Sequence, residues 1–466
     1  MPLIESFSGI RGIYDDGMDE AVALKYTYSY LSLLKKKYKS VKIVIGTDTR
    51  PSKDILKNAV IEALDCDIID IGIASTPMVE FAVRHFKANG GIVITASHNE
   101  PYWNGFKFLD NNGAVLGPKD MDKVISQYNK IKKLSDKGLF TKIYKHNSDD
   151  IKIKKVHKRY DEANKSYSDY ALSFLSKKDI DKIKNSKLKI IIDPNGGTGT
   201  ITKKILEKLN VKVMGINMEH GIFNRAVEPN ESSLIYLSNM VRDKNYDIAA
   251  GFDCDADRVE IVTEKGIVSG NQILALIADE ILKNSKNKAI VVNDATSLSV
   301  KEIAEKHNAK YVETQVGEVN VVDNMYRLKA PIGGEGSSSG VIIPPSRCRD
   351  GILTLLFLLK IIADKGKSIE ELAKELPEFY NVKRKIELNP KKIQNIRKKL
   401  QNHYNKQGYK IKADESGSLK IFLEDSFVWF RASKTESNIL RIITDAPDKK
   451  QAEKLAEETL NLIKAK

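Results

Sequence analysis

The sequence predicts an α/β protein in which three similar α/β domains precede a smaller C-terminal α+β domain. Short runs of β-branched residues alternate with helix-like segments, which is typical of parallel sheets with crossover helices. This alternation occurs three times in the 466-residue chain, and each repeat ends in a polar motif directly after an apolar strand. The last part of the chain departs from the repeat, because two long helices enclose three expected strands there.

The first domain is expected at residues 1–147. Its predicted elements are strands at 41–45, 68–71 and 91–94 and helices at 52–65 and 76–86. The last of these strands leads into Thr95-Ala96-Ser97-His98-Asn99-Glu100, and Pro101 then marks an exposed loop. Ser97 is therefore a candidate nucleophile or phosphate carrier. For this segment alone a structural role stays open, because Ser and Asn also end strands by bonding to their own backbone.

The second domain is expected at residues 148–267, and it begins within the charged stretch 144–168, which marks a boundary region. Its predicted elements are strands at 188–192 and 212–217 and helices at 200–209 and 232–244. Asp253, Asp255 and Asp257 follow the apolar segment 247–252. Three carboxylates at alternate positions can converge on one hard cation, and a divalent ion would compensate their charge. A solvated acidic turn is the simpler structural alternative.

The spacing of the three aspartates also resembles a calcium loop, with Glu264 at the twelfth position. The sixth position is Arg258, however, where the sharp turn of a calcium loop requires glycine. The flanking segments also have the pattern of strands, whereas a calcium loop lies between two helices. Magnesium with open positions for phosphate oxygens is the better prediction.

The third domain is expected at residues 268–371 and the fourth at residues 372–466. Their predicted elements are helices at 271–285, 390–406 and 448–466 and strands at 289–292 and 310–313. Glu335 is a single carboxylate in the cluster Gly333–Gly340, where small residues would let a polyol approach closely. Arg431-Ala432-Ser433-Lys434-Thr435 offers a guanidinium and two hydroxyls to a phosphate. A flexible loop and a charged turn are the respective structural alternatives.

Taken in order, these four segments resemble the α-D-phosphohexomutase superfamily of phosphoglucomutases, phosphomannomutases and phosphoglucosamine mutases, in an archaeal- or bacterial-like form. The family has a T-A-S-H-N phosphoserine loop, a D-x-D-x-D metal loop, a G-E sugar loop and an R-x-S-x-T-E phosphate loop. The resemblance implies three topologically related α/β domains plus a fourth around a central cleft. It also implies interconversion of hexose or hexosamine 1-phosphate and 6-phosphate through a phosphoserine and a hexose 1,6-bisphosphate intermediate or activator.

The resemblance assigns roles to individual residues. Ser97 would be the resting phosphoserine and would bind one Mg²⁺ per chain together with Asp253, Asp255 and Asp257. Lys107, in the segment Asn104-Gly105-Phe106-Lys107, is the first candidate for acid and base work, with Arg258 and His98 secondary. The residues expected to bind substrate are Arg11, Thr314, Gly317, Glu335, Ser337, Ser338, Arg431, Ser433 and Thr435.

The chain departs from the family pattern at several positions. Many members have G-E-x-S-G-H in the sugar loop, but this chain has Gly-Glu-Gly-Ser-Ser-Ser-Gly, so the serine that contacts sugar is either Ser337 or Ser338. Lys434 and Ser437 replace family residues in the phosphate loop, and Cys254 stands where glycine is usual. The preferred sugar therefore does not follow from the resemblance.

Composition and charge narrow the classes of partner. The chain is 41% hydrophobic and 30% charged, and it has neither a long apolar run nor a signal-peptide pattern, so we expect a cytoplasmic protein without a membrane partner. Its net charge of +14 comes from scattered lysine clusters without a nucleic-acid motif, so we expect no nucleic-acid partner. The basic charge would attract anionic sugar phosphates. The three cysteines lack paired spacing, so the sequence suggests neither a disulfide framework nor a zinc site. A monomer or homodimer is expected.

Two alternative functions stay open. Asp253-Cys254-Asp255 follows an apolar strand, as in phosphatases with an aspartate nucleophile, although Ala256-Asp257-Arg258 departs from the usual continuation of such sites. A non-catalytic sugar-phosphate-binding protein is the other alternative. The covalent intermediate distinguishes the mutase from the phosphatase. A phosphoserine survives acid and hydroxylamine, whereas an aspartyl phosphate does not.

Overall fold

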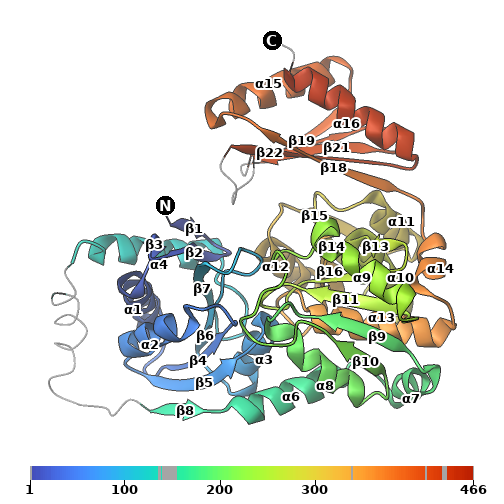
Figure 1. Ribbon diagram of the computed structural model, residues 1–466. Coiled ribbons are helices and arrows are strands. Elements are labelled where there is room, and N and C mark those ends of the chain that lie inside the picture. Colours follow the sequence, from blue (N-terminus) through green and yellow to red (C-terminus); the bar gives the residue numbers. More distant parts are fainter. Residues whose placement is uncertain are drawn as a thin grey trace. The chain divides into compact units, whose positions relative to one another are not determined.

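The computed structural model describes residues 3–134, 138, 155–336, 339–414, 417–432 and 438–464. These residues form four β-sheets, and the chain divides into two compact units. The first unit comprises Met1–Val268 and Gly340–Ser368, and the second comprises Ser269–Ser339 and Ile369–Lys466. Figure 1 shows that helices flank the sheets of each unit. The α/β fold expected from the sequence is confirmed.

The first sheet has eight strands in the order β1-β2-β7-β6-β4-β5-β8, with β3 paired to β2. Strands β4, β5 and β6 run parallel, and β7 runs antiparallel to β6. The strands are β1 (Ile4–Ser6), β2 (Gly9–Tyr14), β3 (Gly17–Met18), β4 (Lys42–Thr47), β5 (Asp67–Ile73), β6 (Gly90–Ile94), β7 (Trp103–Leu109) and β8 (Val156–Lys158). The helices are α1 (Glu20–Lys37), α2 (Lys53–Ala63), α3 (Thr76–His85), α4 (Pro118–Ile131), α6 (Tyr160–Leu172) and α7 (Lys177–Ser186).

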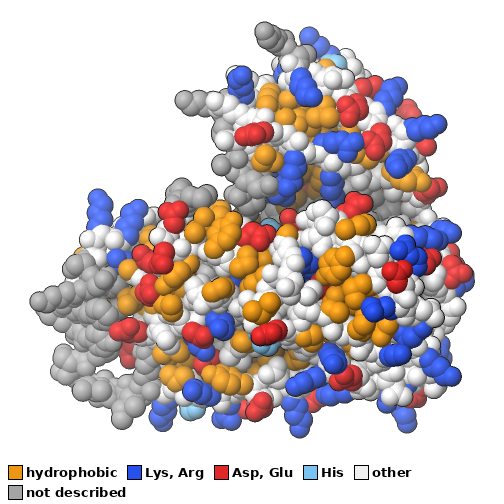
Figure 2. Space-filling view, viewed as in Figure 1, with side chains coloured by type: hydrophobic (Ala, Val, Ile, Leu, Met, Phe, Trp, Pro, Cys, Tyr) orange, Lys and Arg blue, Asp and Glu red, His pale blue; other side chains and the backbone are white. Residues whose placement is uncertain are grey.

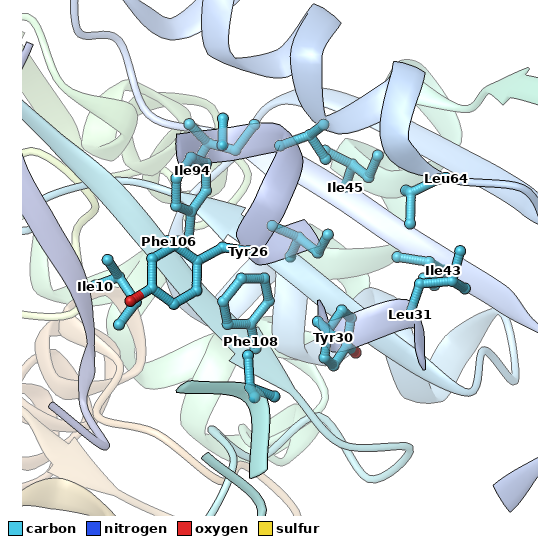
Figure 3. Packing of buried hydrophobic residues seen from close by; sticks show 14 of the residues in the cluster. Ile10, Tyr26, Tyr30, Leu31, Ile43, Ile45, Leu64, Ile94, Phe106 and Phe108 are labelled. Atoms are coloured by element: carbon cyan, nitrogen blue, oxygen red, sulfur yellow. The ribbon is translucent and has the colours of Figure 1, made fainter. Parts of the chain in front are cut away.

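The core of this sheet sets the direction of Lys107. Helices α1, α2 and α4 share one hydrophobic core with one face of the sheet, and Figure 3 shows Tyr26 and Tyr30 of α1 close to Phe106 and Phe108 of β7. The rings of Tyr30 and Phe108 stack with centroids 4.8 Å apart. Since side chains alternate along a strand, Lys107 points to the opposite face, on which α3 lies.

The second sheet has the order β10-β9-β11-β12-β13, with β9 parallel to β10 and β11 and antiparallel pairing from β11 to β13. Its strands are β9 (Lys189–Asp193), β10 (Lys212–Gly215), β11 (Ile248–Phe252), β12 (Val259–Thr263) and β13 (Gly266–Val268). Its helices are the short η1 (Thr198–Thr200), α8 (Ile201–Glu207) and α9 (Glu231–Asp243). Strand β17 (Val341–Ile342) and helix α13 (Gly351–Lys365) complete the first unit, and α13 packs against α7.

Asp350 caps α13, and because its carboxyl is buried we expect the stability of the protein to depend on pH. Its carboxylate accepts hydrogen bonds from the backbone N–H groups of Ile352 and Leu353 and from the Tyr167 hydroxyl, at 3.0, 3.0 and 2.7 Å. Burial nevertheless raises the pKa of Asp350 to about 6. As pH rises from about 4 to about 6, the wild type should therefore lose up to roughly 3 kcal/mol of unfolding free energy relative to Asp350→Asn. Denaturant titrations across this range test the prediction, and a pH-independent difference would contradict it.

The second unit contains strands β14, β15 and β16 of the third sheet and the whole of the fourth sheet. In the third, the central strand β14 (Ala289–Asn293) runs parallel to β15 (Lys310–Thr314) and to β16 (Ile332–Gly334). The fourth is antiparallel, in the order β18-β22-β21-β20-β19. Its strands are β18 (Tyr380–Glu387), β19 (Lys410–Ala413), β20 (Leu419–Phe422), β21 (Phe427–Ala432) and β22 (Ile439–Ala446). The helices of this unit are α10 (Gly270–Asn284), α11 (Leu298–Lys306), α12 (Glu318–Leu328), α14 (Ile369–Lys374), α15 (Pro390–Lys406) and α16 (Lys449–Lys464).

The first three sheets share one arrangement of strands. Each contains three parallel strands, and the one that comes first in the chain lies at the centre, between the second and the third. The order of these three strands is β5-β4-β6 in the first sheet, β10-β9-β11 in the second and β15-β14-β16 in the third. The Ser97, aspartate and Glu335 segments each follow the third strand. The sequence repeat therefore corresponds to a repeat in topology, and each motif occupies the same place in its own sheet.

Some predicted elements differ from the structure. The last domain has five strands, because β18 precedes the long helix and four strands follow it, where the sequence predicted three. The sequence predicts a domain boundary in the stretch 144–168 without assigning elements to it, and its described part contains β8 and the start of α6. Residues 144–154 lie outside the described residues. The short strand β8 pairs with β5, and the hydroxyl of Tyr167 in α6 donates to Asp350. Both contacts join distant parts of the chain, so local sequence patterns do not reveal them.

The surface carries charges of both signs. Figure 2 shows lysine and arginine side chains spread over the visible face, with acidic side chains between them. Within the described ranges, no helix combines the length and the apolar character needed to cross a membrane.

Candidate functional site

Ser97 lies in the loop between β6 and β7, with the hydroxyl turned toward the acidic segment. Its φ of +53° is in the left-handed region, which costs a non-glycine residue on the order of 1 kcal/mol. The Ser97 N–H donates to Thr95 Oγ1 at 2.8 Å, and this bond helps to hold the turn. Ser97 Oγ lies 3.3 Å from Asp253 Oδ2, and the residue is 2% exposed. The strained turn therefore brings the serine hydroxyl to a carboxylate 156 residues away.

Asp253, Asp255 and Asp257 form a buried cluster in the loop between β11 and β12. One carboxylate oxygen of each lies within 4.8 Å of the others. Ala256, with φ of +52°, turns the backbone between the last two. The Oδ1 atoms of Asp255 and Asp257 are buried and accept no hydrogen bond from any residue that the structure describes. Three hard oxygen donors with unused acceptor atoms fit a divalent cation.

Electrostatics in the cluster also favour a cation. Burial, and then the charges of Asp257 and Asp255, raise the pKa of Asp253 well above its usual range. Burial acts in the same direction on Asp257, but Lys107, Arg349 and Arg258 together hold the pKa of that carboxyl below its ordinary value. Asp253 thus remains repelled by the other two carboxylates, and a divalent cation between the three would relieve this repulsion.

Lys107 contacts two of the three aspartates. Its Nζ lies 2.8 Å from Asp255 Oδ2 and 3.2 Å from Asp257 Oδ2. It also lies 3.1 Å from Thr76 Oγ1, and the Thr76 hydroxyl in turn donates to Asp255 Oδ2. Because Lys107 pairs with Val93 across β6 and β7, the strand that leads to Ser97 also positions this amine.

Three further predicted residues surround the Ser97 loop. Arg258 Nε lies 4.0 Å from Asp253 Oδ2 and 3.9 Å from Asp257 Oδ1. Arg11 of β2 donates from Nη1 to Asn99 Oδ1 at 3.1 Å. Burial, and then Arg258 and Arg11, lower the pKa of His98 well below its usual value, so this imidazole is neutral at pH 7. The first unit thus brings together all the predicted site residues that belong to it.

Sequence analysis missed three residues at this site. Arg50 is fully buried and donates to the Ser97 carbonyl at 2.7 Å, and Arg349 Nη2 lies 3.6 Å from Asp257 Oδ2. Thr76 begins α3 and bonds to Asp255 and Lys107. Arg50 has only a weak local signal, since Asp48-Thr49-Arg50 comes shortly after the predicted strand at 41–45. Arg349 has no local signal, because only folding brings it to Asp257.

The second unit holds the predicted sugar and phosphate residues. Glu335 Oε1 accepts from the Gly317 N–H at 2.8 Å and from Asn293 Nδ2 at 3.0 Å. Thr314 ends β15, and Gly317 has φ of +134°, which favours glycine. Arg431 of β21 donates from Nη1 to the Val316 carbonyl at 3.5 Å. Ser337, Ser338, Ser433 and Thr435 lie outside the described residues.

Comparison with known proteins identifies the family. Three models match: domain I of phosphoglucomutase/phosphomannomutase at residues 5–135, domain II at 165–266 and domain III at 269–380. A phosphoglucomutase/phosphomannomutase from Thermococcus kodakarensis is 34% identical, over 98% of this chain and 97% of its own.

Two solved structures have a similar fold. Parafusin, a phosphoglucomutase from Paramecium, superposes with a TM-score of 0.80 at 20% identity, over 98% of this chain and 94% of its own. An N-acetylphosphoglucosamine mutase variant from Aspergillus fumigatus, solved with glucose 1,6-bisphosphate, has a TM-score of 0.60 at 14% identity, over 99% and 95% of the two chains. These structures show the fold alone, whereas the three family models and the Thermococcus kodakarensis relative show that the chain is an isomerase that moves phosphate within hexose phosphates and that it belongs to the phosphoglucomutase/phosphomannomutase family of the α-D-phosphohexomutase superfamily.

Proposed function

We propose that the chain interconverts hexose 1-phosphate and 6-phosphate through a phosphoserine at Ser97. The observation that carries this proposal is the strained, buried Ser97, whose hydroxyl lies 3.3 Å from Asp253 in a cluster of three aspartates. A sugar hydroxyl attacks the phosphorus of phosphoserine, a new sugar O–P bond forms, and the P–Oγ bond breaks. The resulting hexose 1,6-bisphosphate reorients and returns its other phosphoryl group to Ser97, so no phosphate is released.

Asp253, Asp255 and Asp257 are the residues that would hold one Mg²⁺, together with an oxygen of the Ser97 phosphate. When bound, the ion supplies positive charge that neutralises the phosphoryl group during transfer. Arg258 and Arg11 add fixed positive charge beside the same loop. Neutral His98 can donate one hydrogen bond to a phosphate oxygen without acting as a cation.

Lys107 is the proposed proton-transfer residue. Its contacts with Asp255 and Asp257 favour the ammonium form, which can protonate Ser97 Oγ as the phosphoryl group leaves. In the return step the neutral amine would take the proton of the serine hydroxyl. Water would take the proton of the attacking sugar hydroxyl in the first step and protonate the leaving sugar oxygen in the return step, so the full cycle neither gains nor loses a proton.

The second unit would recognise the sugar phosphate. Glu335 would accept hydrogen bonds from sugar hydroxyls, while Thr314 and Gly317 line the same region. Arg431 would bind the phosphate that is not being transferred, with Ser433 and Thr435 as partners by family resemblance. Either Ser337 or Ser338 would contact the sugar, which is a glucose, mannose or glucosamine phosphate. We further propose a cytoplasmic monomer or homodimer with domains at residues 1–147, 148–267, 268–371 and 372–466.

Phosphorylation of Ser97 tests this mechanism directly. We expect peptide mass spectrometry to find one phosphate on the Ser97 peptide after incubation with a hexose 1,6-bisphosphate, because Ser97 is the proposed acceptor. Ser97→Ala should carry none and should lose at least about 10⁴-fold in mutase turnover. Exposed Ser232 on α9 provides the control substitution, Ser232→Ala, which should behave as wild type.

Two other outcomes would favour the alternatives. A hydroxylamine-labile phosphate on the Asp253 peptide, with release of inorganic phosphate, would indicate an aspartate-nucleophile phosphatase. Binding of hexose phosphates without any turnover or covalent phosphate would indicate a binding protein.

A further inference from the structure

The end of the central strand contacts the functional loop in each of the three α/β domains. This strand is β4 in the first domain, β9 in the second and β14 in the third. The residues that follow or end it are Asp48, Asp193 and Asn293, all buried. Each is linked, directly or through one arginine, to the end of the third strand or to the segment after it, which carries Ser97, Asp253 or Glu335.

The link is most extensive in the first domain. Arg50 Nε donates to Asp48 Oδ2 at 2.9 Å, in an ion pair whose side chains are both 0% exposed. Its Nη2 donates to the carbonyls of Ser97 and Asn99, at 2.7 and 2.6 Å. Its Nη1 donates to the carbonyls of Glu100 and Trp103. Thus five bonds use the full donor capacity of the guanidinium, and four of them hold the Ser97 loop.

The other two domains use different residues in the same place. In the second, Arg225 Nε donates to Asp193 Oδ2 at 2.6 Å, and its Nη2 donates to the carbonyl of Phe252 at 2.7 Å. Phe252 directly precedes Asp253 of the aspartate cluster. In the third, Asn293 Nδ2 donates straight to Glu335 Oε1 at 3.0 Å. Arg50 and Arg225 stand at different positions in the sequences of their domains. The same kind of contact is therefore made by residues that do not correspond in the sequence repeat.

We propose that these central-strand residues are positioning residues, and that Arg50 in particular sets the geometry of phosphoryl transfer at Ser97. This inference rests on the proposed function of Ser97. The four carbonyl bonds of Arg50 fix the peptide planes from Ser97 to Trp103, and with them the strained backbone from which Oγ projects. A displacement of about 1 Å at a reacting atom can cost about 100-fold in rate, so the orientation of this loop matters more than the sugar contacts for the transfer step.

Arg50→Lys separates positioning from charge. Lysine keeps a positive charge beside Asp48, but its single nitrogen offers three donors and cannot span four carbonyls. We expect the maximal rate of Ser97 phosphorylation by hexose 1,6-bisphosphate, and kcat, to fall about 100-fold per folded molecule, while KM changes less than about 3-fold. Arg242→Lys, on the exposed surface of α9, is the matched control and should show wild-type values.

A substitution in the third domain should give the opposite kinetic pattern. Asn293→Ala removes the donor that orients Glu335, so we expect KM for the hexose phosphate to rise about 10-fold while the maximal rate of Ser97 phosphorylation falls less than about 3-fold. Equal effects of Arg50→Lys and Asn293→Ala on both parameters would overturn the proposal, because a general loss of structure moves them together.

The remaining outcomes are also decisive. Circular dichroism and thermal unfolding give the folded fraction of each variant. If Arg50→Lys does not fold, the isosteric Asp48→Asn keeps Arg50 but removes its charge partner, and it should lower the phosphorylation rate about 5-fold with KM unchanged. A folded Arg50→Lys, or in its absence Asp48→Asn, with the wild-type phosphorylation rate would overturn the inference. Failure of the wild type itself to become phosphorylated would instead overturn the proposed function of Ser97.

Discussion

Replacing Asp253 by asparagine is expected to lower turnover strongly and at the same time to stabilise the metal-free protein. The turnover loss follows from the proposed cation site, because charge stabilisation worth several kcal/mol corresponds to about 10³-fold in kcat. The gain in stability follows from the observed cluster, in which burial and the neighbouring carboxylates raise the pKa of Asp253. Removing one of the mutually repelling charges should increase the unfolding free energy by about 1 kcal/mol in EDTA.

Asparagine can keep the hydrogen bonds of Asp253. Its Oδ1 can accept from the Arg258 N–H, which lies 3.2 Å from the present Oδ1, and its Nδ2 can donate to Ser97 Oγ. The substitution therefore changes charge with little change in shape. Because a raised carboxyl pKa means that stability is lost as pH rises, the gain from Asp253→Asn should be larger at pH 8 than at pH 5.

Denaturant unfolding in EDTA, and again with Mg²⁺, measures both effects. Added Mg²⁺ should stabilise the wild type and leave Asp253→Asn nearly unchanged. Asp243→Asn, at the exposed last residue of α9 in the same domain, is the matched control. If Asp253→Asn is less stable than the wild type in EDTA, the carboxylates do not repel one another and the argument for a cation loses its basis.

The sequence was sufficient to predict the repeated part of the fold because the evidence for it is local. Strands such as β4, β9 and β14 are buried apolar runs, and the polar residues that follow them interrupt the pattern within a few positions. The place of Ser97 after the third strand followed from this order. The order that places the first of the three parallel strands at the centre was not predicted, because strand pairing is a long-range contact.

The missed residues depend on contacts between distant parts of the chain. Arg50 has the same local appearance as any charged residue after a strand, and its role becomes visible only when four carbonyls from Ser97 to Trp103 surround it. Arg349 approaches Asp257 although 92 residues separate them in the sequence. The extra strands of the last domain were missed for a related reason, since β19 is a short edge strand with charged residues and its pairing with β20 defines it.

Replacing Lys420 by methionine is expected to destabilise the second unit by about 3 kcal/mol, which is the usual effect of breaking a buried ion pair. Lys420 of β20 is 0% exposed. Its Nζ lies 2.6 Å from Glu313 Oε1 and 3.9 Å from the centre of the Phe427 ring. Glu313 is 13% exposed, and Lys412 Nζ is 4.0 Å from its Oε2. Removal of Lys420 therefore leaves a nearly buried carboxylate with a weaker partner.

The same ion pair lies beside the proposed substrate residues. Glu313 directly precedes Thr314, and Lys420 pairs with Trp429 of β21, two residues before Arg431. A second contact joins the third and fourth domains where the Leu298 N–H donates to Asp445 Oδ1 at 2.9 Å. Loss of the ion pair should loosen Arg431 relative to Thr314, so we expect KM for the hexose phosphate to rise about 10-fold and kcat to change less.

A double-mutant cycle with Glu313→Gln separates the ion pair from other effects of methionine. Either single substitution leaves one buried charge without its partner, whereas the double variant removes both charges. We therefore expect the double variant to be more stable than Lys420→Met, with a coupling energy of at least about 1 kcal/mol. Additive losses of stability would mean that Lys420 acts through its packing on Phe427. An unchanged KM in all three variants would mean that this interface supports the fold without positioning Arg431.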